Sequence, residues 1–249
     1  MIVIENLIHN GVPISLSVEG VGLHGLLFER SETKTRWMDL LAGCDCPAEG
    51  DVLLERKESR LPSCEQKKWI GYVPADLSLY EDMTVDELLD FFGEAKGIAP
   101  DKRERQMKEA KDLMGIRAFS HRLISSLSAQ GRRRVIFAQA VLGNPSVIVI
   151  DEPYGALSGE QKRDVESLLK TLGRHKPIVL GSTSADILAL CQTATVIGED
   201  GIRFSGEATS LAEALSRAGE TYEGNMRRTE PVSLSSYFGF CDKKEEERV

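Results

Sequence analysis

Two adjacent carboxylates follow an apolar run in the second half of the chain. Residues 147–150 are all β-branched, and Asp151 and Glu152 come directly after them. A short apolar run of this kind predicts a buried strand, and α/β proteins place their ligands at the carboxyl ends of such strands. Two acidic groups at the end of a buried strand are costly without polar partners. The pair therefore predicts a polar site, whose chemistry would be that of paired carboxylates.

The elements that must position this pair alternate between strand and helix patterns, which indicates an α/β layered domain. Residues 84–87 are Thr-Val-Asp-Glu, a capping box that predicts the start of a helix. We expect residues from about 76 to 142 to form a helical insertion between two strands. The predicted strands cover residues 1–4, 14–18, 21–28, 71–73, 147–150, 178–181, 194–197 and 202–204.

The charge balance limits the classes of function. The chain has 31 basic and 39 acidic residues, a net charge of −8, so we expect no long-range attraction for nucleic acid or anionic lipid. We interpret Arg132, Arg133 and Arg134 as a solvated face or a subunit contact, not as a nucleic-acid site. No apolar stretch approaches the roughly 20 residues of a membrane-spanning helix. A membrane role would therefore require a partner.

The cysteines indicate a reducing, cytoplasmic setting. There are five of them, an odd number without a repeated spacing, and no signal peptide opens the chain. Cys44 and Cys46 could be half of a metal site. Because no histidine lies near them, we interpret them as loop thiols.

Several short motifs occur in one order and at one spacing. The sequence Leu127-Ser128-Ala129-Gln130-Gly131 is followed by three arginines, by residues 138–142 and by the predicted strand of residues 147–150. This spacing resembles the one that joins the signature helix of ABC ATPases to their Walker B strand. Other segments of the chain resemble further motifs of ABC ATPases and occur in the same order as in that family. The resemblance therefore covers about residues 1–207. Residues 79–85 and 138–142 are most similar to the ABC-2 export group.

The resemblance implies a fold. We expect an α/β protein with a RecA-like P-loop core, an antiparallel β region near the N-terminus and an inserted helical subdomain at about 76–142. The ABC ATPase-like domain would cover residues 1–207. We interpret residues 208–249 as a C-terminal extension that is partly flexible, since it ends in a polar run.

The phosphate-binding loop departs strongly from the family. Its pattern Gly-x-x-x-x-Gly-Lys-Ser/Thr falls on residues 28–35, where Phe28 and Thr33 replace the two glycines. Glycine lets this loop turn sharply and bring N–H groups against phosphate oxygens, in conformations that a residue with a Cβ resists. Glu29 and Glu32 add negative charge. We therefore expect ATP and magnesium to bind weakly.

Four residues keep the polar groups of the family. Lys34 matches the lysine that contacts phosphate, Thr35 and Asp151 match the magnesium-binding residues, and Glu152 matches the carboxylate that polarises the attacking water. Glu152 is thus the candidate catalytic residue if the chain is active. Two other interpretations stay open. Lys34 and Thr35 can be ordinary first-turn helix residues, and an ion pair between Lys34 and Asp151 can keep both without nucleotide.

Other family positions are altered. Ala75 replaces the Q-loop glutamine, Ser158 replaces the D-loop aspartate, and Ser184 replaces the switch histidine. A serine cannot hold the γ-phosphate and orient water as an imidazole can, so hydrolysis should suffer. Ser128 matches the signature serine, which in the family meets the γ-phosphate bound by a partner subunit. An ordinary helix N-cap explains Ser128 equally well.

These departures lead to one main hypothesis and two alternatives. In the family, two ATP-binding subunits pack head to tail, with each nucleotide between the Walker motifs of one and the signature of the other. We predict a non-hydrolysing or weakly active subunit that forms a heterodimer with an intact ABC ATPase. It would dock on a membrane permease at the inner face of the cell membrane. The alternatives are an active ATPase that drives export and a soluble regulatory pseudo-ATPase outside transport.

Overall fold

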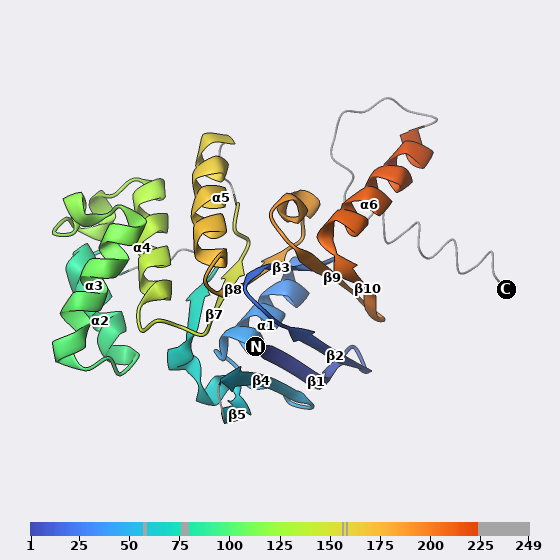
Figure 1. Ribbon diagram of the computed structural model, residues 1–249, viewed down its shortest axis with the longest axis horizontal. Helices are drawn as coiled ribbons and strands as arrows, with labels where there is room; N and C mark the ends of the chain where they lie inside the picture. Colours follow the sequence, from blue (N-terminus) through green and yellow to red (C-terminus); the bar gives the residue numbers. More distant parts are fainter. Residues whose placement is uncertain (57–58, 76–79, 156, 158, 224–249) are drawn as a thin grey trace.

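The described part of the chain contains two β-sheets and six α-helices, arranged as in Figure 1. The computed structural model describes residues 1–56, 59–75, 80–155, 157 and 159–223. The strands are β1 (Ile2–His9), β2 (Val12–Val18), β3 (Gly22–Phe28), β4 (Asp51–Arg56), β5 (Ser59–Pro62), β6 (Ile70–Val73), β7 (Val147–Asp151), β8 (Pro177–Ser182), β9 (Thr193–Gly198) and β10 (Gly201–Glu207). The helices are α1 (Ser31–Ala42), α2 (Val85–Ala95), α3 (Pro100–Met114), α4 (Ala129–Val141), α5 (Gly159–Gly173) and α6 (Ala208–Glu223).

The larger sheet has six strands in the order β10-β9-β3-β8-β7-β6, and the apolar runs of the sequence predicted each of them. Neighbouring strands are parallel, except that β10 runs antiparallel to β9. Every residue of β3 and β7 is buried, as expected of central strands covered on both faces. Asp151, at the end of β7, lies beside Gly181 of β8. The carboxyl ends of β7 and β8 therefore lie next to each other.

The smaller sheet is the antiparallel β region near the N-terminus, with the order β2-β1-β4-β5. Its buried residues Ile2, Ile4 and Leu54 share one apolar cluster with Met38 and Leu41 of α1 and with one face of the larger sheet. The helix α1 thus packs in the core that joins the two sheets. The sequence did not predict β4 and β5, because their apolar and polar residues alternate only weakly.

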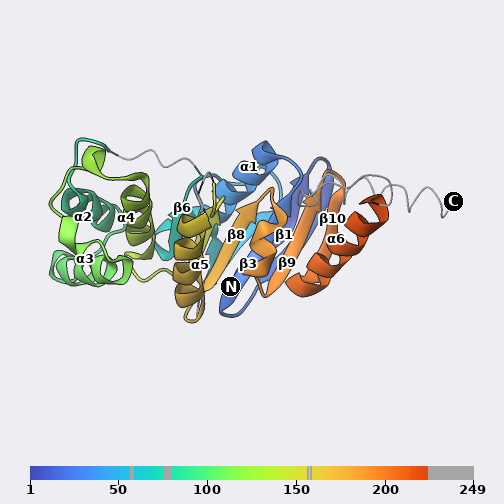
Figure 2. The ribbon, with the colours of Figure 1, turned by 90° about the horizontal axis from the view of Figure 1, so that it is seen from above.

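Three helices, α2, α3 and α4, lie between β6 and β7 in the sequence and form a group beside the larger sheet (Figure 2). The predicted capping box of α2 is confirmed: Thr84 Oγ1 accepts from the Glu87 amide at 3.2 Å, and the Glu87 carboxylate accepts from the Thr84 amide at 2.8 Å. Gln139 Nε2 of α4 donates to the carbonyl of Tyr72 in β6 at 2.7 Å. This hydrogen bond fixes α4 to the edge of the sheet.

The helices α5 and α6 cover the face of the larger sheet opposite α1 (Figure 2). α5 packs on β3 and β8, and α6 packs on β9 and β10. Ala208, Leu211 and Leu215 of α6 are buried in the same core as α5. The core therefore continues past residue 207, where the sequence placed the start of an extension; residues 224–249 lie outside the described residues. No described helix is long and apolar enough to cross a membrane.

The interpretation of Cys46 as a loop thiol is wrong in this structure. Cys46, after α1, forms a disulfide with Cys64, after β5, and their Cα atoms are 5.9 Å apart. The pairing depends on how the turn after α1 meets the segment after β5, which the spacing of the cysteines does not reveal. Cys44 is a free, exposed thiol, as predicted, and Cys191 is free and buried.

Candidate functional site

The candidate site begins at the connection between β3 and α1. β3 ends at Phe28 and α1 begins at Ser31, so Glu29 and Arg30 alone connect them. The amide of Lys34 donates to the carbonyl of Arg30 at 3.1 Å and so belongs to the first helical turn. The segment 28–35 is therefore the end of a strand, a two-residue connection and a helix.

The side chain of Lys34 extends to the end of β7. Its Nζ forms an ion pair with Oδ1 of Asp151 and lies 3.4 Å from Oε1 of Glu152. Thr35 Oγ1 donates to the second oxygen of Asp151, Oδ2, at 3.3 Å. The structure thus brings together all four predicted residues of the Walker half-site, and the anticipated ion pair between Lys34 and Asp151 is present.

The ion pair between Lys34 and Asp151 is almost completely removed from water, since each side chain is 1% exposed. Burial raises the pKa of the Asp151 carboxyl, the hydrogen bond and charge of Lys34 oppose that rise, and the charge of Glu152 adds to it. A buried carboxylate without a cation is strongly destabilising. Lys34 therefore acts as the counter-ion that allows Asp151 to stay buried.

The carboxylate of Glu152 is held by residues at the end of β8. Ser182 Oγ donates to Oε2 at 3.0 Å, and Thr183 donates to Oε1 through its amide at 3.0 Å and its hydroxyl at 3.3 Å. Both carboxylate oxygens of Glu152 are thus engaged within the chain. The side chain of Glu152 is therefore anchored to the end of β8.

The backbone of Glu152 is strained, and Arg133 supports it. Glu152 has a φ of 48°, in the left-handed region, which costs a residue with a Cβ about 1–2 kcal/mol. Arg133 Nη2 donates to the carbonyls of Glu152 and Pro153. The expectation of a solvated arginine face is wrong for Arg133, which is 8% exposed. Successive residues of a helix point in different directions, so the middle arginine turns toward the core.

Sequence reasoning missed three residues of this site: Ser182, Thr183 and Arg133. Ser182 and Thr183 follow a predicted strand directly, so the rule that selected Asp151 and Glu152 could also have selected them. Arg133 carried no comparable signal, because three consecutive arginines do not indicate which one is buried.

Comparison with known proteins decides the family. The sequence pattern described as ABC transporter matches residues 14–155, more than half of the chain. The chain belongs to the ABC transporter family. It is an ATP-binding domain of that family, and its relatives are ABC ATPases.

Relatives are found over most of the chain. ABC transporter A family member 1 of Dictyostelium discoideum is 29% identical over 227 residues, which cover 91% of this chain and 26% of that protein. The ABC transporter ATP-binding protein NatA of Bacillus subtilis is 24% identical over 81% of this chain and 83% of NatA. The uncharacterized ABC transporter ATP-binding protein YxlF of Bacillus subtilis is 27% identical over 76% of this chain. The chain spans 26% and 62% of the lengths of the first and third of these relatives.

Solved ABC cassettes share the fold. The structure of cbiO1 from Clostridium perfringens, part of the ABC transporter complex cbiONQ, aligns with a TM-score of 0.73 at 18% identity and covers 90% of this chain and 95% of its own. The dimeric structure of MJ0796, a bacterial ABC transporter cassette, gives 0.69 at 18% identity over 84% of this chain and 99% of its own. These similarities confirm the predicted α/β fold class.

The predicted signature and Q-loop positions lie away from the ion pair. Ser128 is exposed at the N-cap of α4, where its Oγ accepts from the Gly131 amide at 3.2 Å. It is not among the residues that contact Lys34 or Glu152. Ala75 is exposed just after β6.

Ser184, at the predicted switch-histidine position, has a local structural role. Ser184 caps a short 3₁₀ helix (Ala185–Ala189), and its Oγ accepts from the Asp186 amide at 3.2 Å. Its own amide donates to Ser182 Oγ at 3.0 Å. Ser184 therefore supports the turn that holds Glu152. Ser158, at the D-loop position, lies outside the described residues.

The residues present fit magnesium better than they fit a triphosphate. Thr35 and Asp151 provide adjacent oxygens of the kind that magnesium binds. The phosphate cradle does not fit: Phe28, at the first glycine position, is fully buried in β3, and Thr33, at the second, is inside α1. Glu32 places a negative charge in the first turn of α1. The oxygen donors are kept, whereas the described residues form no loop around a phosphate.

Proposed function

We propose that this chain is a non-hydrolysing or weakly active ATP-binding-type subunit of an ABC transporter. The observation that carries the proposal is the combination of a two-residue connection before α1 with the buried ion pair of Lys34 and Asp151. A lysine that serves as counter-ion to a buried aspartate is not free to reach a phosphate. Contact with phosphate would also require Asp151 to be stabilised by another cation.

The surroundings of Glu152 support the same proposal. Its two oxygens accept three hydrogen bonds from Ser182 and Thr183, and Lys34 lies 3.4 Å away. A general base must reach the water that it activates, and both oxygens of Glu152 already accept hydrogen bonds within the chain. Glu152 is thus suited to holding the turn after β7.

We propose that the functional unit is a heterodimer with an intact ABC ATPase, docked on a membrane permease at the inner face of the cell membrane. An exposed aromatic pair supports a docking role: Tyr80 is 52% and Phe91 42% exposed, and their rings are 5.5 Å apart. Exposed aromatic groups that lie together are typical of contact surfaces. We also propose an affinity with ABC-2 exporters, on the similarity of residues 79–85 and 138–142.

Titration calorimetry with magnesium and ATP tests the proposal on the purified full chain. We expect no binding at concentrations where an intact ABC ATPase, as positive control, binds. If binding occurs and is lost in Lys34→Ala but kept in Lys170→Ala, an exposed lysine of α5, the proposal is wrong. Circular dichroism of each variant is needed to show that it is folded, because Lys34→Ala leaves Asp151 without its counter-ion.

A second candidate function is an active ATPase subunit. The observation that favours it is the direct contact among Lys34, Thr35, Asp151 and Glu152 at the ends of α1 and β7. Its test is the turnover of the assembled complex with Glu152→Gln in this chain. Unchanged turnover excludes the active subunit, and a loss that exceeds the effect of the same substitution at the exposed Glu160 supports it.

A further inference from the structure

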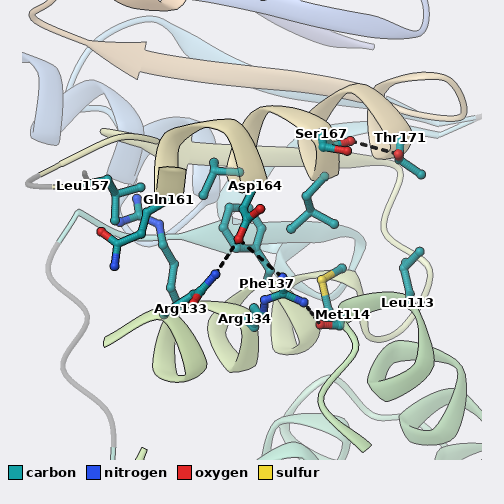
Figure 3. Close-up of a pocket in the computed structure, with 13 residues that line it drawn as sticks. Leu113, Met114, Arg133, Arg134, Phe137, Leu157, Gln161, Asp164, Ser167 and Thr171 are labelled. Carbon is teal, nitrogen blue, oxygen red and sulfur yellow. Dashed lines mark hydrogen bonds and ion pairs between the residues drawn. The ribbon is translucent and has the colours of Figure 1, made fainter. Parts of the chain in front are cut away.

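A cavity of about 270 Å³ lies between α4, α5 and the end of α3 (Figure 3), and neither Lys34 nor Asp151 lines it. A volume of this size is close to the lower end of small-molecule sites, so it suits a compact ligand. Much of its wall is apolar and comes from all three helices: Leu113, Met114, Phe137, Val165 and Leu168. This apolar part of the wall favours a ligand with an apolar body.

One wall of this cavity carries a buried charge without a counter-ion. Arg133 lines the cavity and is 8% exposed. Its Nη2 donates to two backbone carbonyls, but its Nε is buried and has no hydrogen-bond partner among the described residues. No carboxylate forms an ion pair with Arg133 in the described part of the chain. A guanidinium in this state is costly, and burial lowers its pKa.

The other charged groups of the cavity neutralise one another. Asp164 of α5 accepts a hydrogen bond from Gln130 Nε2 and lies 3.8 Å from Nη2 of Arg134 (Figure 3). Arg134 also donates to the carbonyl of Met114 at 3.0 Å. The charges of Asp164 and Arg134 cancel, so the formal charge of the cavity wall is the single positive charge of Arg133. The cavity is therefore complementary to a single negative charge.

We propose that this cavity binds a compact organic monocarboxylate, with its apolar body against α3, α4 and α5 and its carboxylate against Arg133. Arginine and a carboxylate form short, charge-assisted hydrogen bonds, so a carboxylate beside Arg133 supplies the counter-ion that this residue lacks among the described residues. The same guanidinium contacts the carbonyl of Glu152 at 3.2 Å. Ligand binding would thus act on the turn that carries Glu152. The proposal does not depend on nucleotide binding.

The test uses two matched pairs of probes on the full chain. Benzoate and hexanoate carry the proposed charge, and benzamide and hexanamide have nearly the same shape without it. Saturation-transfer NMR detects binding, and competition titrations give the dissociation constants. We expect both carboxylates to bind at least about tenfold more tightly than their amides, a difference typical of one charged hydrogen-bonding partner.

Three variants locate the binding. Arg133→Gln should remove the preference for the carboxylate, whereas Arg105→Gln, which removes one charge from the exposed face of α3, should keep it. Ser167→Phe, at an exposed position that lines the cavity, should fill it and weaken the binding of both members of each pair. Ser167→Phe leaves the contacts of Arg133 intact. It therefore shows whether the probes bind in the cavity even if Arg133→Gln does not fold.

Any of three results overturns the proposal. The first is that neither carboxylate binds the unmodified chain up to millimolar concentrations. The second is that the amides bind as tightly as the carboxylates. The third is that Ser167→Phe leaves carboxylate binding unchanged, which would place the probe elsewhere on the surface.

Discussion

Replacing Lys34 with methionine removes the counter-ion of Asp151 and keeps most of the volume of the side chain. Both side chains are 1% exposed, so no water replaces the lost cation. Breaking one side of a buried ion pair costs about 3–5 kcal/mol of stability. Thr35 still donates to Asp151, and Glu152 keeps its hydrogen bonds to β8. We therefore expect the free energy of unfolding to fall by about 3 kcal/mol, the lower end of this range.

The double variant Lys34→Met with Asp151→Leu separates the charge from the packing. Replacing both members of a buried pair with apolar groups of similar size is often neutral or stabilising. We expect the double variant to be more stable than Lys34→Met alone. Urea denaturation followed by circular dichroism gives the free energies of unfolding, with Lys170→Met, at an exposed position, as the control for a lysine lost from a helix.

The pH dependence of Lys34→Met provides an independent check. Burial raises the pKa of Asp151, so in the variant the folded state binds a proton more tightly than the unfolded state does. The variant should thus recover stability relative to the unmodified chain as the pH falls toward 3.8, the ordinary pKa of an aspartate. A cost of Lys34→Met below about 1 kcal/mol, the range of exposed ion pairs, would refute a dry, structural ion pair.

Three further predictions concern stability and are measured by urea denaturation. Burial lowers the pKa of His24 below 6.5, so the free energy of unfolding should fall as the pH drops below 6.5. His24→Gln should make this pH dependence less steep, and an unchanged dependence would contradict the buried, neutral state of His24. The double variant Cys46→Ser with Cys64→Ser removes a cross-link between residues 18 positions apart, and it should lower the free energy of unfolding by about 3 kcal/mol under oxidising conditions. Equal stability of the variant and the unmodified chain would mean that the disulfide is absent. Thr84→Ala removes the cap of α2 and should cost about 1 kcal/mol, most of which Thr84→Ser should restore.

The sequence predicted the strand that ends beside Asp151 and Glu152, because its apolar run is short and consists of β-branched residues. It also predicted which four residues meet, through the family resemblance. The sequence could not show whether Lys34 binds phosphate or pairs with Asp151, because the choice depends on the residue at which α1 begins. The partners of Glu152 on β8 and the burial of Arg133 depend on the register between strands and on the rotation of α4, which single-sequence patterns do not specify.

The early start of α1 has a consequence for any attempt to introduce the family's glycine-rich loop. Substituting glycine for Phe28 and Thr33 would recreate the family's pattern in letters, but residues 31–33 would still be a helical turn. Phe28 is also fully buried, with its ring 5.9 Å from that of Trp37, so its removal opens a cavity in the core that joins the two sheets. Rebuilding the loop therefore requires unwinding a helix and repacking a core at the same time. Packing therefore opposes the family's glycine pattern at residues 28–33, while the polar side chains of Lys34, Thr35, Asp151 and Glu152 lie together beside it.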